Sequence, residues 1–249
     1  MKKILKKLVN YFGYEVIRSR PPPQVDFMSL VSLLLYKEPK DFFFVQIGAN
    51  DGKKNDPLYD LVIKYNLSGL LVEPLSGVFQ SLLKNYSGNS NLIFENVAIS
   101  DKEGFQPMYE IKKEFQDVFE KHTKEKATMM ASFNKDHVRK FLRRGMGEFF
   151  KDKQIDDYID EVQVKTTSFD TLMQKHQIKS IDLLQIDTEG FDFEIIKMVD
   201  FNKYSPKLIN YESVHLNASD RAQCESLLKE KGYQLINNKA DTYAIKEAS

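Results

Sequence analysis

Short apolar runs separated by helical stretches dominate the chain after its first forty residues. These runs predict strands at 42–47, 69–72, 92–97, 181–186 and 207–211. The runs FFFVQI and IDLLQI hardly alternate between apolar and polar residues, which is typical of parallel strands that helices cover on both faces. The pattern therefore predicts an α/β fold with a mostly parallel central sheet.

Two segments depart from this alternation of strand and helix. Near the C-terminus, GYQLI, NNKAD and TYAIK follow a polar helix at 226–231, which predicts an antiparallel hairpin that closes the sheet. Residues 105–165 show mixed helical periodicity and are rich in Lys, Glu, Met and Phe. The sheet does not need this segment, so we interpret it as a helical insertion that forms a lid over the functional site.

The first forty residues have a pattern of their own. Residues 2–12 place apolar side chains at helical spacing and lysines on the opposite face, which predicts a short basic amphipathic helix. Three prolines at 21–23 then favour an extended linker. We therefore divide the chain into an extension at 1–40 and one domain at 41–249. The helix could rest on an anionic membrane, or dock on its own domain or on a second subunit of a homo-oligomer, and both interpretations stay open.

Composition narrows the class of protein. The 249 residues are 42% hydrophobic and 29% charged, which excludes a disordered or fibrous chain. Lys plus Arg and Asp plus Glu both number 36, so no net positive charge attracts nucleic acid. The single cysteine, Cys224, excludes an intramolecular disulfide and a multi-thiolate zinc site and fits a reducing compartment. No apolar run approaches the roughly 20 residues that cross a bilayer, and no secretion signal is evident. We expect a cytoplasmic protein, with residues 2–12 as its one candidate for contact with the inner face of a membrane.

The loops after the strands carry the candidate chemistry, because ligands of open α/β sheets bind outside the carboxyl ends of the strands. In IGANDG, Gly48 and Gly52 allow a sharp turn close to a ligand. Glu73 ends the second strand about 20 residues later, the spacing at which an acid accepts hydrogen bonds from a ribose diol. The loop lacks G-x-G-x-x-G, so a nucleoside without phosphates, such as S-adenosylmethionine, fits better than a dinucleotide. A ligand-free tight turn, and a helix cap formed by Glu73 before Pro74, are the alternatives.

Five motifs occur in a fixed order: FVQIGANDG, GLLVEP, NVAIS, TTSFDTL and LLQIDTEGFDFEII. With them the chain resembles the FkbM-type methyltransferases, which are S-adenosylmethionine-dependent enzymes of the Rossmann-like class. The resemblance covers about residues 42–215 and is weakest in the insertion. It implies the Rossmann-like class I methyltransferase fold.

The resemblance also implies roles for individual residues. The methionine and ribose part of the cofactor would be wrapped by Gly48, Ala49, Asn50, Asp51 and Gly52, and Glu73 would hold the ribose hydroxyls. The adenine would lie beside Asn96, Val97 and Ala98, with Ser100 in the same loop. Asp187 and Glu189 would line the methyl-transfer site. The chain departs from the family pattern in Gln46 and Ile47, where Asp-Val is frequent, and in Gln185, where Lys is frequent.

A general base is expected at the same edge of the sheet. NYESVH ends the fifth strand and places Glu212 and His215 beside Asp187. Because histidine titrates near pH 6.5, His215 is the first candidate for the base and Asp187 the second. His215 could instead be structural, and Asp187 and Glu189 could instead stabilise the start of the next helix. A divalent metal held by Asp187 and Glu212 is a rival use of these acids, although the sequence carries no dedicated metal motif.

The insertion contains a basic run within SFNKDHVRKFLRRG. It could hold an anionic glycan or a phosphate, but we favour a solvated helix face whose apolar residues pack inward. The basic residues are Lys135, His137, Arg139, Lys140, Arg143 and Arg144, and the apolar ones are Val138, Phe141 and Leu142.

The sequence thus predicts methyl transfer from S-adenosylmethionine to an oxygen atom, with S-adenosylhomocysteine as the product. The resemblance and the basic N-terminal helix favour a sugar hydroxyl in a glycan or glycan precursor as the acceptor. Four alternatives remain: a natural-product (polyketide) hydroxyl as the acceptor, a nitrogen atom as the acceptor, a nucleoside-binding module without catalysis, and an oxidoreductase that uses NAD.

Overall fold

The computed structural model describes residues 25–37 and 42–247. The amphipathic helix predicted at 2–12 and the prolines at 21–23 lie outside the described residues. Within the described part of the chain, no helix is both long enough and apolar enough to cross a bilayer.

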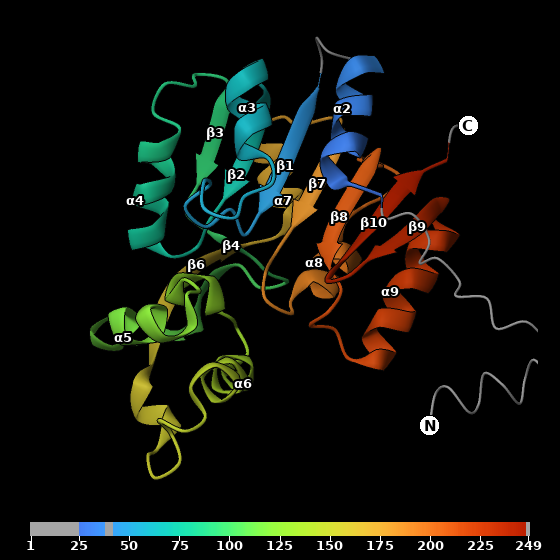
Figure 1. Cartoon of the computed structure of the whole chain (residues 1–249). Helices are drawn as coiled ribbons and strands as arrows, with labels where there is room; N and C mark the ends of the chain where they lie inside the picture. The colour runs from blue at the N-terminus through green and yellow to red at the C-terminus, as the bar shows by residue number, and fades with distance from the viewer. Residues whose placement is uncertain (1–24, 38–41, 248–249) are drawn as a thin grey trace, which may run out of the picture.

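A seven-stranded sheet forms the centre of the molecule, in the order β3-β2-β1-β7-β8-β10-β9 (Figure 1). The first five strands in this order are parallel, and β10 pairs antiparallel with both β8 and β9. This confirms the predicted α/β class and the C-terminal hairpin. The strands are β1 (Phe43–Ile47), β2 (Ser68–Val72), β3 (Leu92–Glu95), β7 (Leu183–Ile186), β8 (Leu208–Glu212), β9 (Tyr233–Asn238) and β10 (Asp241–Lys246).

Helices cover both faces of this sheet, as the continuous apolar runs require. Phe44 points into the core on one face of β1, whereas Val45 and Ile47 point into the core on the other. The Phe44 face packs on α2 (Phe27–Lys37), α3 (Tyr59–Tyr65) and α4 (Ser76–Asn85). The opposite face packs on α7 (Phe169–Lys175), α8 (Asp192–Met198) and α9 (Ala218–Glu230). Burial on both faces explains why the strands lack an alternating pattern.

Helix α2 falls within the segment that the sequence assigned to the N-terminal extension. Its Phe27, Val31 and Leu35 follow the i, i+4, i+8 spacing of one helix face and are buried in the core. The ring of Phe27 lies 5.6 Å from that of Tyr243, measured between centroids. The folded domain therefore includes α2, and the boundary predicted at residue 40 lies too late in the chain.

The insertion at 105–165 is not purely helical, which corrects the prediction. Strands β5 (Gly104–Ile111) and β6 (Ile159–Thr167) pair antiparallel at its two ends and join β4 (Ala98–Ile99) in a second sheet of order β4-β6-β5. This pairing joins residues about fifty positions apart, so local periodicity could not reveal it. Pro107 lies in β5, an edge strand of this sheet, where proline is tolerated.

Between β5 and β6 lie the helical parts of the lid. They are α5 (Lys113–Thr123), η1 (Ala127–Met130), α6 (Lys135–Met146) and η2 (Ile155–Tyr158). Their apolar side chains form a separate small core around Phe119, Val138 and Leu142. Helices α5 and α6 lie beyond the carboxyl ends of β1, β2 and β3 (Figure 1). The insertion is thus placed at the edge of the sheet where ligands of such folds bind.

The basic run of the insertion forms much of α6, and its apolar residues do pack inward. Val138 and Leu142 are fully buried. On the outer side, Arg139 forms salt bridges with Asp136 and Asp156. The basic residues are therefore partly neutralised by acids of the lid itself, which supports the solvated-face interpretation.

Candidate active site

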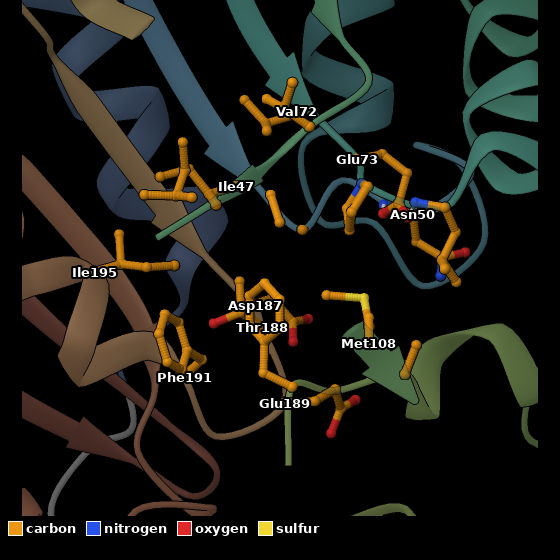
Figure 2. Close-up of a pocket in the computed structure, with 18 of the residues that line it drawn as sticks. Ile47, Asn50, Val72, Glu73, Met108, Asp187, Thr188, Glu189, Phe191 and Ile195 are labelled. Atoms are coloured by element: carbon orange, nitrogen blue, oxygen red, sulfur yellow. Dashed lines mark hydrogen bonds between the residues drawn. The ribbon is translucent and has the colours of Figure 1, made fainter. Parts of the chain in front are cut away.

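A cavity of about 660 Å³ lies between the carboxyl ends of β1, β2 and β7 and the underside of the lid. The strand order reverses between β1 and β7, and the cavity lies at that point. Figure 2 shows Glu73 and Asn50 at one end of the cavity and Asp187 and Glu189 at the other.

The predicted site residues divide into those that line this cavity and those that lie behind it. The lining residues among them are Gly48, Asn50, Glu73, Val97, Ala98, Asp187 and Glu189. Outside the lining lie Ala49, Asp51, Gly52, Asn96, Ser100, Glu212 and His215.

Gly48 is the residue that lets the β1 and β7 loops approach each other. Its φ angle is +81°, and a Cβ atom there would lie only 1.8 Å from the carbonyl oxygen of Asp187. Its backbone N–H donates to the Val72 carbonyl at 3.0 Å, which fixes the turn to the end of β2. Glycine is required because another residue would meet both the backbone strain and the clash.

Three neighbours of Gly48 support the loop from behind. Ala49 is buried in the core, and a Cβ atom on Gly52 would meet α4 at Leu82. The carboxylate of Asp51 accepts hydrogen bonds from two backbone N–H groups of its own loop and forms an ion pair with Lys126 of the lid. These residues therefore shape the loop and tie it to the lid rather than line the cavity.

Glu73 connects the loops after β1 and β2. It is only 5% exposed. One carboxylate oxygen accepts from the Asn50 N–H at 3.0 Å and the other from the Leu75 N–H at 2.9 Å. Burial raises its pKa to about 7. Helix α4 begins after Leu75 without a side-chain cap, so Glu73 holds the loop and does not cap the helix. Each carboxylate oxygen of Glu73 keeps a further lone pair for a hydroxyl group.

The wall beside Glu73 is apolar and is held in place by polar residues behind it. Val97, Ala98 and Met108 line this part of the cavity. Asn96 donates to the carbonyls of Glu73 and Pro74 at 2.8 and 2.9 Å and so fixes the loop after β2. Ser100 is buried and accepts from Gln106 at 2.7 Å.

Asp187 and Glu189 form the acidic end of the cavity. The Asp187 N–H donates to the Ile47 carbonyl at 3.0 Å, which anchors the loop after β7 to β1. The Asp187 side chain opens onto the cavity, while the protein around it and the carboxyls of Glu212 and Asp192 raise its pKa well above the usual range. Neither acid caps the next helix, because α8 begins after Phe191 without a side-chain cap.

The acid that organises this loop is Asp192, which the sequence reasoning missed. It is fully buried and accepts from the Thr188 N–H and hydroxyl at 3.1 and 2.8 Å. Its other oxygen accepts from the Glu212 N–H at 2.9 Å, which links the loop after β7 to the end of β8. The sequence does contain a hint of this role, because Asp192 is a further acid that follows DTEG within the same motif.

His215 and Glu212 reach the cavity only through Glu189. The His215 Nε2 atom lies 3.3 Å from a Glu212 oxygen and 3.5 Å from a Glu189 oxygen. The hydrogen bond to Glu212 raises the pKa of His215, and burial together with Glu212 raises that of Glu189 to about 8. The structure thus brings the expected residues together but places His215 behind Glu189.

His137 of the lid joins this group, and the sequence did not reveal it. Its Nε2 atom lies 3.0 Å from the Glu189 carboxylate, and burial lowers its pKa to about 4. The sequence placed His137 on the solvated face of the basic helix. Its i+4 spacing to Phe141 was the available signal, since the two rings lie 4.8 Å apart on the inner face.

Two departures from the family pattern lie inside the sheet. Gln46 donates to Asp56 at 3.1 Å, and Gln185 accepts from Asn210 at 2.9 Å. Both glutamines are buried, and neither lines the cavity. The exchange of charge for amide therefore changes the sheet interior and leaves the cavity wall as described.

Comparisons with known proteins give distant structural likenesses and one family match. The METTL16 MTase domain is 11% identical and covers 96% of this chain and 74% of that chain, with a TM-score of 0.45. The ribosomal protein L11 methylase of Lactobacillus delbrueckii subsp. bulgaricus is 8% identical and covers 88% and 78%, with a TM-score of 0.40. Comparison with curated proteins gives no match. A family model described as "Methyltransferase FkbM domain" matches residues 46–235, well over half of the 249 residues. The chain therefore belongs to the FkbM methyltransferase domain family.

Proposed function

We propose that this chain is an S-adenosylmethionine-dependent O-methyltransferase that modifies a sugar hydroxyl in a glycan or glycan precursor. One observation carries the proposal: a single cavity joins Glu73, at the end of β2, to Asp187 and Glu189, at the end of β7. A ligand that fills it would have its ribose at one end and its reactive group at the other. Membership of the family supports methyl transfer as the reaction.

The residues present fit the cofactor. Gly48 lines the cavity and carries no side chain, so its backbone can contact a ligand there. Glu73 offers carboxylate oxygens to a diol, and the wall of Val97, Ala98 and Met108 suits a flat apolar ring. When bound, S-adenosylmethionine supplies a methyl group on a sulfonium, and S-adenosylhomocysteine is the product.

The protein would act mainly by positioning the acceptor and by excluding water. On the lid side the cavity is lined by Met129 and Phe133, and the ring of Phe133 packs 5.2 Å from that of Phe191. Asp187 opens onto the cavity and is therefore placed to take the proton of an acceptor hydroxyl. His215 lies behind Glu189, so we now rank Asp187 above it as the general base.

A second cavity supports a polar acceptor. It shares Asn50, Pro74, Leu75 and Thr128 with the first. Charged and amide groups of its wall offer hydrogen bonds to a molecule with many hydroxyls. They include Asp51, Glu110, Lys113, Gln116, Lys126 and Gln163. An apolar polyketide would displace water from these polar groups without replacing its hydrogen bonds, which makes it the less favoured acceptor.

The first experiment is a calorimetric titration of the purified protein with S-adenosylmethionine, S-adenosylhomocysteine and NAD. We expect micromolar binding of both adenosyl ligands and none of NAD. Glu73→Ala should abolish this binding, whereas Glu148→Ala, which changes an exposed lid residue, should retain it. Binding of NAD alone, or of none of the three, would overturn the proposal. Binding without turnover on any glycan or natural-product hydroxyl would favour a non-catalytic module.

A further inference from the structure

Four side chains converge at the acidic end of the cavity, and we call them the histidine–carboxylate cluster: His137, Glu189, Glu212 and His215. They come from three separate parts of the chain: α6 of the lid, the loop after β7, and the end of β8 with the loop that follows it. One donor atom each of His137, Glu189 and His215 lies within 4.8 Å of the other two. Such convergence of imidazole and carboxylate from distant segments is typical of a metal centre.

The distances within the cluster fit a shared coordination sphere. The two histidine Nε2 atoms lie 3.0 and 3.5 Å from the same Glu189 oxygen, and a Glu212 oxygen lies 3.3 Å from His215. Ligands bound at about 2.1 Å in tetrahedral or octahedral geometry are roughly 3.0 to 3.4 Å apart. Hydrogen bonds have similar lengths, so the same distances would fit side chains that share protons instead of a metal ion. The charges of the cluster must distinguish the two arrangements.

The charges favour a cation. The carboxyls that interact electrostatically here are Asp187, Glu189, Asp192, Glu212 and Asp241. Among the residues that the structure describes, the only salt-bridge partners of Glu189 and Glu212 are His137 and His215. The second oxygen of Glu212 is buried and has no hydrogen-bond partner within that part of the chain. An excess of carboxyl groups and a buried, unpartnered carboxylate oxygen are both stabilised by a bound cation.

We propose that His137, Glu189 and His215 bind a divalent first-row transition metal ion, with Glu212 as a further ligand. Two imidazoles favour zinc, iron, nickel or copper over magnesium, which prefers oxygen ligands alone. Because His137 belongs to α6, the ion would also connect the lid to the sheet. Glu189 lines the cavity, so the ion could orient an acceptor diol. That last role rests on the proposed function, whereas metal binding itself does not.

The test is metal binding by the chelator-treated full chain. Zinc chloride is titrated by calorimetry, and bound zinc is counted by elemental analysis after dialysis. We expect one zinc per chain, no binding of magnesium at the same concentrations, and about 100-fold weaker zinc binding in His137→Ala and in His215→Ala. His122→Ala, which changes an exposed histidine of α5, should bind zinc as the unchanged protein does.

A further variant distinguishes loss of a metal ligand from loss of folding. Glu189→Gln keeps a side chain of the same shape and should also lose zinc, while circular dichroism confirms that each variant is folded. Absence of zinc binding in the unchanged protein, or equal binding by the His137 and His122 variants, would overturn the proposal. So would binding of magnesium that Glu212→Gln abolishes and His137→Ala does not. Titration of the same metal-free protein with S-adenosylmethionine tests the proposed function separately.

Discussion

The burial of Glu73 should make the stability of the protein depend on pH in a predictable direction. Burial raises the pKa of this carboxyl from 4.5 to about 7 in the folded state. Between these two values the folded protein holds a proton that the unfolded chain has released. The free energy of unfolding therefore includes a contribution from Glu73 that is fully present below pH 4.5 and is lost as the pH rises through 7.

The size of this contribution follows from the shift. A difference of about 2.5 pH units, at about 1.36 kcal/mol per unit, gives about 3 kcal/mol. That is a large fraction of the roughly 5–15 kcal/mol that stabilises an ordinary domain. Other buried acids also contribute to the pH dependence, so Glu73 is isolated by comparing the protein with Glu73→Gln, which cannot titrate.

The assay is urea unfolding at pH 5, 6, 7 and 8, followed by circular dichroism. We expect the unchanged protein to lose about 2.5 kcal/mol more than Glu73→Gln between pH 5 and pH 8, because part of the full contribution is already lost at pH 5. Glu148→Gln, the exposed control, should follow the unchanged protein. Parallel curves for the unchanged protein and Glu73→Gln would show that the carboxyl is not desolvated as the structure places it. A buried acid that destabilises the fold near neutral pH is the type of residue expected at a binding site.

Three further predictions concern the loop, the base and the lid. Gly48→Ala should lower the free energy of unfolding, measured in urea, by at least about 2 kcal/mol, because it combines positive φ with a backbone clash. Gly77→Ala should not lower it, because nothing lies within 4 Å of the new Cβ. Asp187→Asn should reduce turnover about 100-fold or more in a methyl-transfer assay while calorimetry shows S-adenosylmethionine still bound. Leu142→Ala should leave a cavity in the lid core that lowers its stability by about 2–5 kcal/mol. Limited proteolysis should then cleave the lid faster.

Each of these predictions has a result that would contradict it. Equal stability of the two glycine variants would mean that the β1 and β7 loops are farther apart than they are here. Full turnover by Asp187→Asn would return the role of base to His215. Unchanged cleavage of Leu142→Ala would show that the lid does not depend on its own core.

Much of the fold was predictable because it depends on local patterns. The parallel strands were found because burial on both faces leaves continuous apolar runs such as that of β1, and the hairpin because turn residues separate two strands. The loop after β1 could be predicted because a sharp turn requires glycine at Gly48. Glu73 could be predicted because it is the acid that directly follows an apolar strand. The family motifs added residues such as Ala98 that the pattern alone would not have selected.

What the sequence could not determine is what depends on contacts between distant segments. The pairing of β5 with β6 spans the insertion, so local periodicity showed its helices and concealed its strands. His137 looked like part of a charged helix face, and only the packing of α6 on the end of the sheet brings it to Glu189. His215 followed the correct strand, but the course of the loop placed it behind Glu189 rather than at the cavity. Local sequence determined where the chain turns and which residues are buried, whereas tertiary packing decided which side chains meet, because that depends on how separate elements are oriented against one another.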